Sequence, residues 1–305
     1  MSTVFLGTSE FAVAILDRLA LSDAHRPALV VTRPDRPRGR GRRLGSSPVA
    51  ERARALEIPL AQPDSVNDSQ ARALIAETGP QTVVVCAFGA LIKEPLLSEH
   101  TILNVHPSLL PRWRGAAPIE RAMMAGDAST GVSIMRLTAG LDSGPVCLTG
   151  AEPIHPEDTF GSLSPRLSEI GGELLVRALD DAPPFVEQLE EGITYAEKIA
   201  PEDRLLDPHR PAIEVERVVR ALHPHIGARL ALADGTLLGV HRAVIVDDES
   251  SGGKVEGAAG VLAHDGRLLL QCTPGVLELL DVQPPGGRAM DAGSYLRGHG
   301  SPGRT

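Results

Sequence analysis

Cysteine is scarce in this chain, with three residues among 305. Cys86, Cys147 and Cys272 lie far apart, and none belongs to a CxxC pair or to a spacing of Cys and His typical of a metal site. An odd and scattered set favours neither a disulfide framework nor a zinc site. We therefore expect the three cysteines to be buried apolar residues, and we expect no metal ion.

Long apolar runs and targeting segments are also missing. No stretch approaches the roughly 18 uninterrupted apolar residues that a membrane-spanning helix needs, and the amino terminus lacks a basic segment followed by an apolar one. We expect a cytoplasmic protein. The turn that begins at Gly7 lacks the second and third glycines of GxGxxG, which disfavours a dinucleotide cofactor because a pyrophosphate could not approach the backbone closely.

What the chain does contain is enough apolar sequence, 42% of its residues, for two domains. Apolar runs alternate with helical segments over the first half, which predicts a doubly wound, mostly parallel α/β sheet of the Rossmann-like kind that binds ligands at the carboxyl ends of its strands. The predicted strands are 3–6, 29–32 and 82–87, and the predicted helices are 11–21, 47–56 and 69–77.

The second half has a different pattern. Near residue 190 the alternation of apolar runs with helical segments ends, and proline and acidic residues follow. We therefore expect a catalytic domain over 1–189, a linker over 190–206 and a second domain over 207–305. Hairpin signals at Asp234-Gly235 and Asp265-Gly266, with a further turn at Pro274-Gly275, predict several short strands in a small β-barrel of the oligonucleotide-binding type. We also expect a flexible polar loop over 247–257 and a disordered tail from Gly298.

The segment from Asn104 to Pro118 has an unusual composition. It follows a short apolar strand that delivers Asn104 and His106 to the same side, because side-chain direction alternates. Two prolines then stop the strand, and small residues leave room for a flat ligand near the backbone. A lone histidine is commonly structural and an asparagine at a strand end is commonly a turn former, but their joint occurrence here indicates a pocket.

A carboxylate follows about thirty residues later in the tight turn Gly140-Leu141-Asp142-Ser143-Gly144. Taken alone, Asp142 is typical of an ordinary turn. Beside His106, a carboxylate can orient the imidazole and stabilise its charged form, as acyl transfer often requires. Asn104, His106 and Asp142 are therefore the candidate catalytic residues.

Arginine is concentrated in the segment 33–43 of a chain whose formal net charge is -9. Its prolines and glycines exclude a helix or a central strand and predict a mobile exposed loop. Such a charge run is often only a solvated face, but an acidic protein with arginines gathered on one loop has reason to attract a polyanion such as RNA. The residues predicted to contact RNA are Arg36, Arg38, Arg40, Arg42 and Arg43.

The order Asn-x-His-x-Ser-Leu-Leu-Pro-x-Trp-Arg-Gly from residue 104, followed by GLDSG from residue 140, resembles the folate-dependent formyltransferases. The segments FLGTSEFA, PDRPRGRGRRL, VVVCAFGALI and TYAEKI extend the likeness over nearly the whole chain, and they make it similar to the members that act on initiator methionyl-tRNA. The resemblance implies transfer of a formyl group from 10-formyltetrahydrofolate to that tRNA for translation initiation. A monomer is expected.

The resemblance also implies roles for individual residues. Asn104 is assigned as a donor to the formyl oxygen, His106 as stabiliser of the oxyanion and candidate proton donor, and Asp142 as the group that orients His106 and takes part in proton transfer. The residues expected to shape the folate pocket are Ser108, Leu109, Leu110 and Pro111, with Phe88, Gly89 and Leu91 on the facing strand end. No metal enters this chemistry.

Two alternatives stay open at this point. A formyltransferase that acts on a sugar nucleotide or a small amine keeps the three candidate catalytic residues but needs no arginine loop. A non-catalytic tRNA-binding protein keeps the basic loop and the second domain but not those three residues. The sequence contains both sets, which favours a formyltransferase that binds tRNA.

Overall fold

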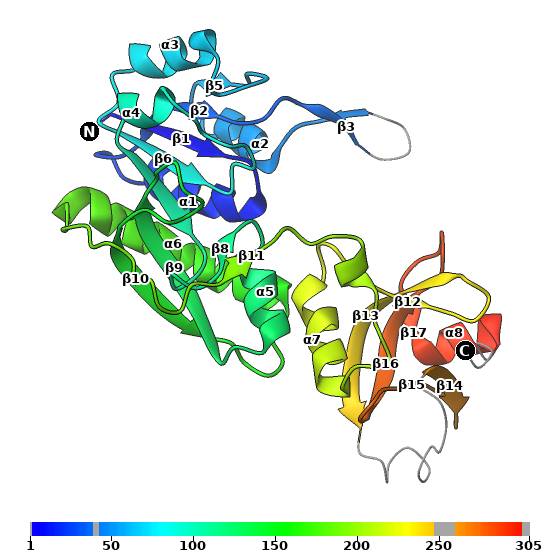
Figure 1. The fold of residues 1–305 in the computed structure, drawn as a ribbon. Helices are drawn as coiled ribbons and strands as arrows, with labels where there is room; N and C mark the ends of the chain where they lie inside the picture. The colour runs from blue at the N-terminus through cyan, green and yellow to red at the C-terminus, as the bar shows by residue number, and fades with distance from the viewer. Residues whose placement is uncertain (1, 39–42, 247–259, 301–305) are drawn as a thin grey trace. The chain divides into compact units, whose positions relative to one another are not determined.

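The computed structural model describes residues 2–38, 43–246 and 260–300 (Figure 1). The chain divides into two compact units, and the second unit takes two short segments from within the first 163 residues. The first unit comprises Met1–Pro118, Ser129–Pro153 and Ser164–Ala196, and the second comprises Ile119–Ala128, Ile154–Leu163 and Glu197–Thr305.

A seven-stranded sheet forms the centre of the first unit, in the order β10-β9-β7-β6-β1-β2-β5. The five strands from β7 to β5 are parallel, and β9 and β10 are antiparallel additions. This arrangement confirms the predicted mostly parallel sheet. Its strands are β1 (Thr3–Gly7), β2 (Pro27–Val31), β5 (Leu60–Ala61), β6 (Thr82–Cys86), β7 (Ile102–His106), β9 (Ser129–Arg136) and β10 (Val146–Pro153).

The helices of the first half connect these strands and include the three that the sequence predicts. Ser9 caps the first of them, because its hydroxyl accepts a hydrogen bond from the Ala12 amide at 3.3 Å. The helices are α1 (Glu10–Ala20), α2 (Pro48–Ala55), α3 (Ser69–Glu77), α4 (Leu96–Glu99), α5 (Pro118–Ala125) and α6 (Phe160–Asp181).

Helix α6 packs closely on one face of this sheet. A Cβ at Gly171 would lie 3.0 Å from a methyl of Val105 and 3.2 Å from the end of Ile15 on α1, so glycine is what lets the three elements meet. Since side chains alternate along a strand, Val105 on this face places Asn104 and His106 on the opposite one. The packing of α6 therefore decides which face carries the candidate catalytic residues.

The second unit is built on a six-stranded antiparallel sheet. The predicted turns at Asp234-Gly235, Asp265-Gly266 and Pro274-Gly275 each join two neighbouring strands, which confirms the expected series of short strands joined by tight turns. Its elements are η1 (Glu202–Arg204), α7 (Ala212–Leu222), β12 (Ala228–Ala231), β13 (Leu237–Val246), β14 (Gly260–His264), β15 (Arg267–Gln271), β16 (Val276–Gln283), β17 (Met290–Asp291) and α8 (Ala292–His299).

Helix α7 closes the core of this unit. Val215 and Val219 lie on one face of the helix and pack with Leu238, Leu268 and Leu277 of the sheet. The expected disordered tail is wrong at its start, because α8 continues to His299 and its Tyr295 is buried. The predicted loop over 247–257 and residues 301–305 lie outside the described residues.

Two of the three cysteines are buried as expected. Burial raises the pKa of the Cys86 thiol far above its ordinary value and that of Cys272 to about 11. Cys147 is only partly buried, because it lies on β10 at the edge of the sheet. In the described parts of the chain, no helix has the length and hydrophobicity that a membrane crossing requires.

Candidate active site

Strand β7 carries the first two candidate residues at its carboxyl end. Asn104 lies beside Val85 of β6, and His106 lies beside Ser133 of β9. Both side chains are buried, with residue exposures of 8% and 4%. The end of a parallel strand is where ligands bind in this class of sheet, and here it brings an amide and an imidazole to one place.

Asp142 joins these two residues from the loop between β9 and β10. Its Oδ1 accepts a hydrogen bond from Asn104 Nδ2 at 3.4 Å, and its Oδ2 accepts one from the backbone amide of Gly115 at 2.8 Å. The same Oδ2 lies 3.7 Å from Nδ1 of His106. The structure thus brings together all three predicted catalytic residues, although 36 to 38 positions separate Asp142 from the strand residues.

His106 is held by a hydrogen bond from one of its ring nitrogens. Nε2 donates to the carbonyl oxygen of Trp113 at 2.8 Å, which leaves Nδ1 facing the Asp142 carboxylate. The ring therefore cannot turn without losing the Trp113 bond, and its orientation toward the carboxylate is fixed before any ligand binds. A group fixed in this way loses little entropy when it acts on a bound substrate.

Sequence reasoning missed two residues that support this arrangement. Gln188 Nε2 donates to the carbonyl oxygens of Asp142 and Gly144, each at 2.8 Å. Its Oε1 accepts from Nε and Nη2 of the buried Arg114 at 3.0 and 2.7 Å. Gln188 stands in an acidic, proline-flanked stretch without periodicity, so no local pattern marks it as part of the site.

The segment predicted to shape a folate pocket is fixed by its own polar groups. The Ser108 hydroxyl is fully buried and donates to the Arg112 carbonyl at 2.6 Å, while Ser133 accepts from the Leu110 amide at 3.1 Å. Leu109 packs over Gly131, where a Cβ would lie 2.5 Å from its Cδ2. Ser108 and Leu109 thus set the course of the chain, and their contact with folate stays a prediction.

Leu110 and Pro111 line a cavity of about 280 Å³. The other side of this cavity is formed by residues 146–149 of β10 and by residues 186–189. Most of the lining side chains are apolar, so the cavity suits an uncharged part of a ligand. Their role in binding folate also remains a prediction.

The three residues predicted on the facing strand end follow β6. Phe88 is buried in the core beside the sheet, and its carbonyl accepts from the Thr8 hydroxyl at 2.9 Å. Gly89 adopts a φ of +72°, which glycine allows without strain. Leu91 is 66% exposed. Leu91 is therefore the residue of this group that can meet a ligand through its side chain.

The arginine-rich segment differs from the loop that its composition predicts. Strands β3 (Arg36–Arg38) and β4 (Arg43–Gly45) pair as an antiparallel hairpin, with Arg38 opposite Arg43, and β3 extends outward from the sheet of the first unit (Figure 1). Proline and glycine exclude a central strand, but a two-stranded hairpin leaves half of its backbone groups to solvent and tolerates them. Arg40 and Arg42 lie outside the described residues.

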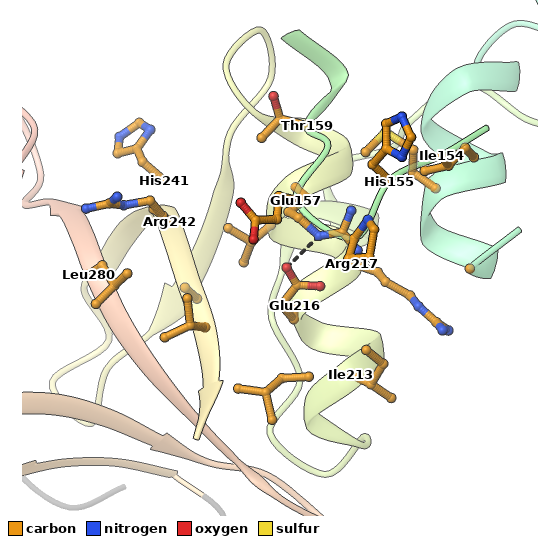
Figure 2. A pocket seen from close by; sticks show the side chains of 18 of the residues that line it. Ile154, His155, Glu157, Thr159, Ile213, Glu216, Arg217, His241, Arg242 and Leu280 are labelled. Atoms are coloured by element: carbon orange, nitrogen blue, oxygen red, sulfur yellow. Dashed lines mark hydrogen bonds and ion pairs between the residues drawn. The ribbon is translucent and has the colours of Figure 1, made fainter. Parts of the chain in front are cut away.

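A larger cavity of about 640 Å³ lies in the second unit (Figure 2). One face of α7 lines it, and there Glu216 binds Arg220, which also donates to the Asp158 carbonyl at 2.7 Å. Arg242 on β13 extends away from α7 (Figure 2), and it pairs with Asp281 at 2.8 Å. Glu216 and Arg220 are thus engaged with each other, and Arg242 is engaged with Asp281. Within the described residues, no group of three His, Cys, Asp or Glu side chains is arranged to hold a metal ion.

Comparison with protein families matches both halves of the chain. The model of the formyl transferase family matches residues 1–179, and that of the formyl transferase C-terminal domain matches residues 198–300. A methionyl-tRNA formyltransferase of Dechloromonas aromatica is 40% identical over 302 residues, which cover 98% of this chain and 96% of that protein. One of Dinoroseobacter shibae is 41% identical over 308 residues, covering 100% and 99%.

Solved structures show the same fold at low sequence identity. A methionyl-tRNA formyltransferase from Clostridium thermocellum aligns with a TM-score of 0.61 at 14% identity, over 81% of this chain and 94% of that one. HypX from Aquifex aeolicus, solved with tetrahydrofolic acid, aligns with a TM-score of 0.62 at 16% identity, over 96% of this chain and 46% of that one.

Proposed function

Because this chain belongs to the formyl transferase family in both of its units, we propose that it formylates the α-amino group of methionine on initiator methionyl-tRNA, with 10-formyltetrahydrofolate as donor. The observation that carries the proposal is the meeting of Asn104, His106 and Asp142 at one strand end, in a chain about 40% identical over its full length to methionyl-tRNA formyltransferases. The product serves translation initiation.

Each of the three residues has a defined task in this reaction. When bound, the folate supplies the formyl group. Asn104 donates an N–H toward the formyl oxygen, and His106 stabilises the negative charge that this oxygen gains, a contribution of about 3 to 4 kcal/mol for one such donor. Asp142 keeps His106 oriented and accepts the proton that the attacking amine loses. His106 gives a proton to the folate nitrogen as its bond to the formyl carbon breaks, and transfer of the proton from Asp142 to His106 restores both groups.

The surroundings of these residues fit a folate. The pairing of Asn104 with Val85 means that the chain leaving β6 starts beside β7, and the exposed side chain of Leu91 in that segment supports a role in contacting the donor. A flat, largely apolar ring with polar edges matches a site that offers both kinds of surface. Gly89 and Leu91, with Leu110 and Pro111 across the strand end, are the residues we propose to hold the donor.

The acceptor is proposed from the two features that a small-substrate enzyme does not need. One is the concentration of arginine in residues 33–43, because guanidinium groups suit phosphate. The other is the second unit, which matches the C-terminal domain of the formyl transferase family. Together they favour tRNA over a sugar nucleotide. We also propose that the enzyme acts as a monomer in the cytoplasm, where initiator tRNA is charged.

The experiment offers three acceptors to the purified chain together with 10-formyltetrahydrofolate. They are methionyl initiator tRNA, methionyl elongator tRNA and a nucleotide-linked amino sugar. We expect formylmethionine after deacylation of the initiator tRNA and little product from the other two. Preferential formylation of the amino sugar would contradict the proposal.

A further inference from the structure

Residues 186–196, here called the strap, form hydrogen bonds with two segments of the first unit. One is the segment that follows β7 and contains Trp113, and the other is the loop that contains Asp142. The sequence of the strap predicts a boundary and the start of a linker, yet the first unit extends to Ala196. Val186 pairs with Val146 in an isolated antiparallel bridge, with both hydrogen bonds at 2.9 Å. Further along, β11 (Tyr195–Ala196) pairs in parallel with β8 (Arg114–Gly115). The strap is thus fastened at both ends.

The side chain of Gln188 in the strap holds the loop that contains Asp142. The Gln188 amide donates to the carbonyls of Asp142 and Gly144, and its oxygen is held by the buried Arg114. Asp142 has a φ of +42°, in the left-handed region that a residue with a Cβ disfavours. Such a backbone persists only where its surroundings determine it, and the two bonds from Gln188 are part of those surroundings.

The side chain of Thr194 in the strap holds Trp113, the residue that orients His106. The Thr194 hydroxyl accepts a hydrogen bond from the Trp113 amide at 2.8 Å, and the Trp113 carbonyl accepts one from His106 Nε2, also at 2.8 Å. Trp113 has a φ of +61°, so it too adopts the disfavoured left-handed conformation. The strap therefore contacts Asp142 and Trp113, two non-glycine residues of the site that adopt this disfavoured backbone conformation.

The close approach of the strap depends on Gly115. A Cβ at this position would lie 2.6 Å from the carbonyl oxygen of Ala196, and the φ of Gly115 is +122°. The Ala116 amide then donates to that carbonyl at 2.7 Å. The Gly115 amide itself donates to the Asp142 carboxylate, so one residue joins the strap to the catalytic carboxylate.

We propose that Gln188 and Thr194 are positioning residues for the formyl transfer: Gln188 sets Asp142 and Thr194 sets His106 through Trp113. The kinetic effects that we expect from this inference rest on the proposed function. Both side chains act through hydrogen bonds to the backbone of the segments that carry the catalytic residues. Their loss affects the chemical step more than the binding of either substrate, because misplacing a catalytic group by about 1 Å can cost about 100-fold in rate.

The test for Gln188 is the variant Gln188→Glu. Its carboxylate has the same size and still accepts from Arg114, but it cannot donate to the two loop carbonyls. We expect kcat to fall about 10-fold to 100-fold, with KM for folate and tRNA within about threefold. We also expect the pH–rate profile of kcat to move, because the geometry between Asp142 and His106 changes. The matched control is Glu191→Gln, an exposed residue of the strap outside the cavity that Leu110 and Pro111 line, which should leave all three unchanged.

Thr194 offers a pair of variants that separates positioning from folding. Thr194→Val keeps the shape and removes the acceptor for the Trp113 amide, whereas Thr194→Ser keeps the acceptor. We expect a loss of about tenfold in kcat for the first and recovery to within about threefold for the second, with similar melting temperatures. If Gln188→Glu fails to fold, this pair still decides the question for the strap.

A readout that does not depend on turnover is the Nε2–H proton of His106, followed by NMR. In the parent protein its bond to the Trp113 carbonyl should slow exchange with solvent. Thr194→Val should accelerate that exchange, and Thr194→Ser should restore it. Failure of the parent to formylate tRNA would count against the proposed function alone, because this signal tests the strap separately. Unchanged kcat, pH profile and His106 exchange in the variants would overturn the inference.

Discussion

The candidate active site of the first unit and the ion pair between β13 and β16 of the second unit hold their polar side chains differently. In the first unit, the buried Asn104 and His106 bond to a distant loop and to backbone groups. In the second, Arg242 and Asp281 form an ion pair whose side chains are 65% and 38% exposed. Buried bonds fix orientation, whereas exposed pairs contribute little free energy. Changes in the first unit should therefore alter the rate, and changes in the second should alter tRNA use or stability by smaller amounts.

The largest effect is expected at Asp142. Asp142→Asn keeps the shape but removes the charge that faces His106 and the proton acceptor of the reaction, so kcat should fall about 100-fold to 10,000-fold. Steady-state kinetics at saturating substrates measure it, with Asp23→Asn as a control that makes the same change at an exposed position. A loss of less than about threefold would remove Asp142 from the mechanism and weaken the contrast between the units.

Truncation tests the second unit as a whole. A fragment of residues 1–206 retains all of the first unit and should bind folate, but it lacks the six-stranded sheet and should use tRNA poorly, with kcat/KM at least about tenfold lower. Residues 119–128 and 154–163 lose the unit they pack with, so its melting temperature should also drop. Folate binding by fluorescence and tRNA formylation rates measure the two parts. Equal tRNA use by fragment and parent would assign the second unit another role.

The arginine hairpin belongs to the first unit, but its contribution to tRNA binding should come from charge and not from the orientation of a catalytic group. Neutralising Arg40 and Arg42 to Gln should weaken tRNA use and flatten its salt dependence by about one to two units of log–log slope, since fewer counterions are released. Folate affinity and thermal stability should stay the same. Initial rates against tRNA concentration at several salt concentrations give the slope, and Arg177→Gln on α6 is the control. An unchanged slope would falsify the role of the hairpin.

The smallest effect is expected for the pair of Arg121 and Asp203 in the second unit. Two hydrogen bonds at 3.0 and 2.7 Å hold the pKa of Asp203 below its ordinary value of 3.8. The stabilisation is therefore present above pH 3.8 and is lost as pH falls through the lowered pKa.

Asp203→Asn measures that stabilisation directly. It should lower the free energy of unfolding by about 0.5 kcal/mol at pH 7, and by progressively less in acid. Urea unfolding of parent and variant at neutral and acidic pH gives the difference. A difference that grows as pH falls would contradict the sign.

Local patterns in the sequence are enough to predict much of this molecule. The alternation along β7 places Asn104 and His106 on one side, and the turn residues at Asp234-Gly235 mark a hairpin, because both depend on neighbouring residues. The second domain as an antiparallel β unit follows from the same turn signals. The tight turn that carries Asp142 is likewise visible as a cluster of glycines around one carboxylate.

The features that sequence reasoning missed depend on contacts between distant segments. Gln188 donates hydrogen bonds to two carbonyl groups that lie 46 and 44 positions earlier in the chain, and no periodic pattern in the sequence predicts such bonds. The assignment of residues 119–128 and 154–163 to the second unit is likewise a matter of tertiary packing. The arginine segment pairs with itself as a hairpin although proline and glycine disfavour strands, since the pairing of Arg38 with Arg43 needs few ladder bonds.

The most direct measurement is the transfer of a labelled formyl carbon from 10-formyltetrahydrofolate to methionyl initiator tRNA in a single turnover, for the parent and for His106→Ala. We predict labelled formylmethionine from the parent and a rate at least about 100-fold lower in the variant. Both proteins should bind folate and tRNA with similar affinity. No transfer by the parent, or a variant rate within about threefold of the parent rate, would show that this chain does not use His106 to formylate initiator tRNA.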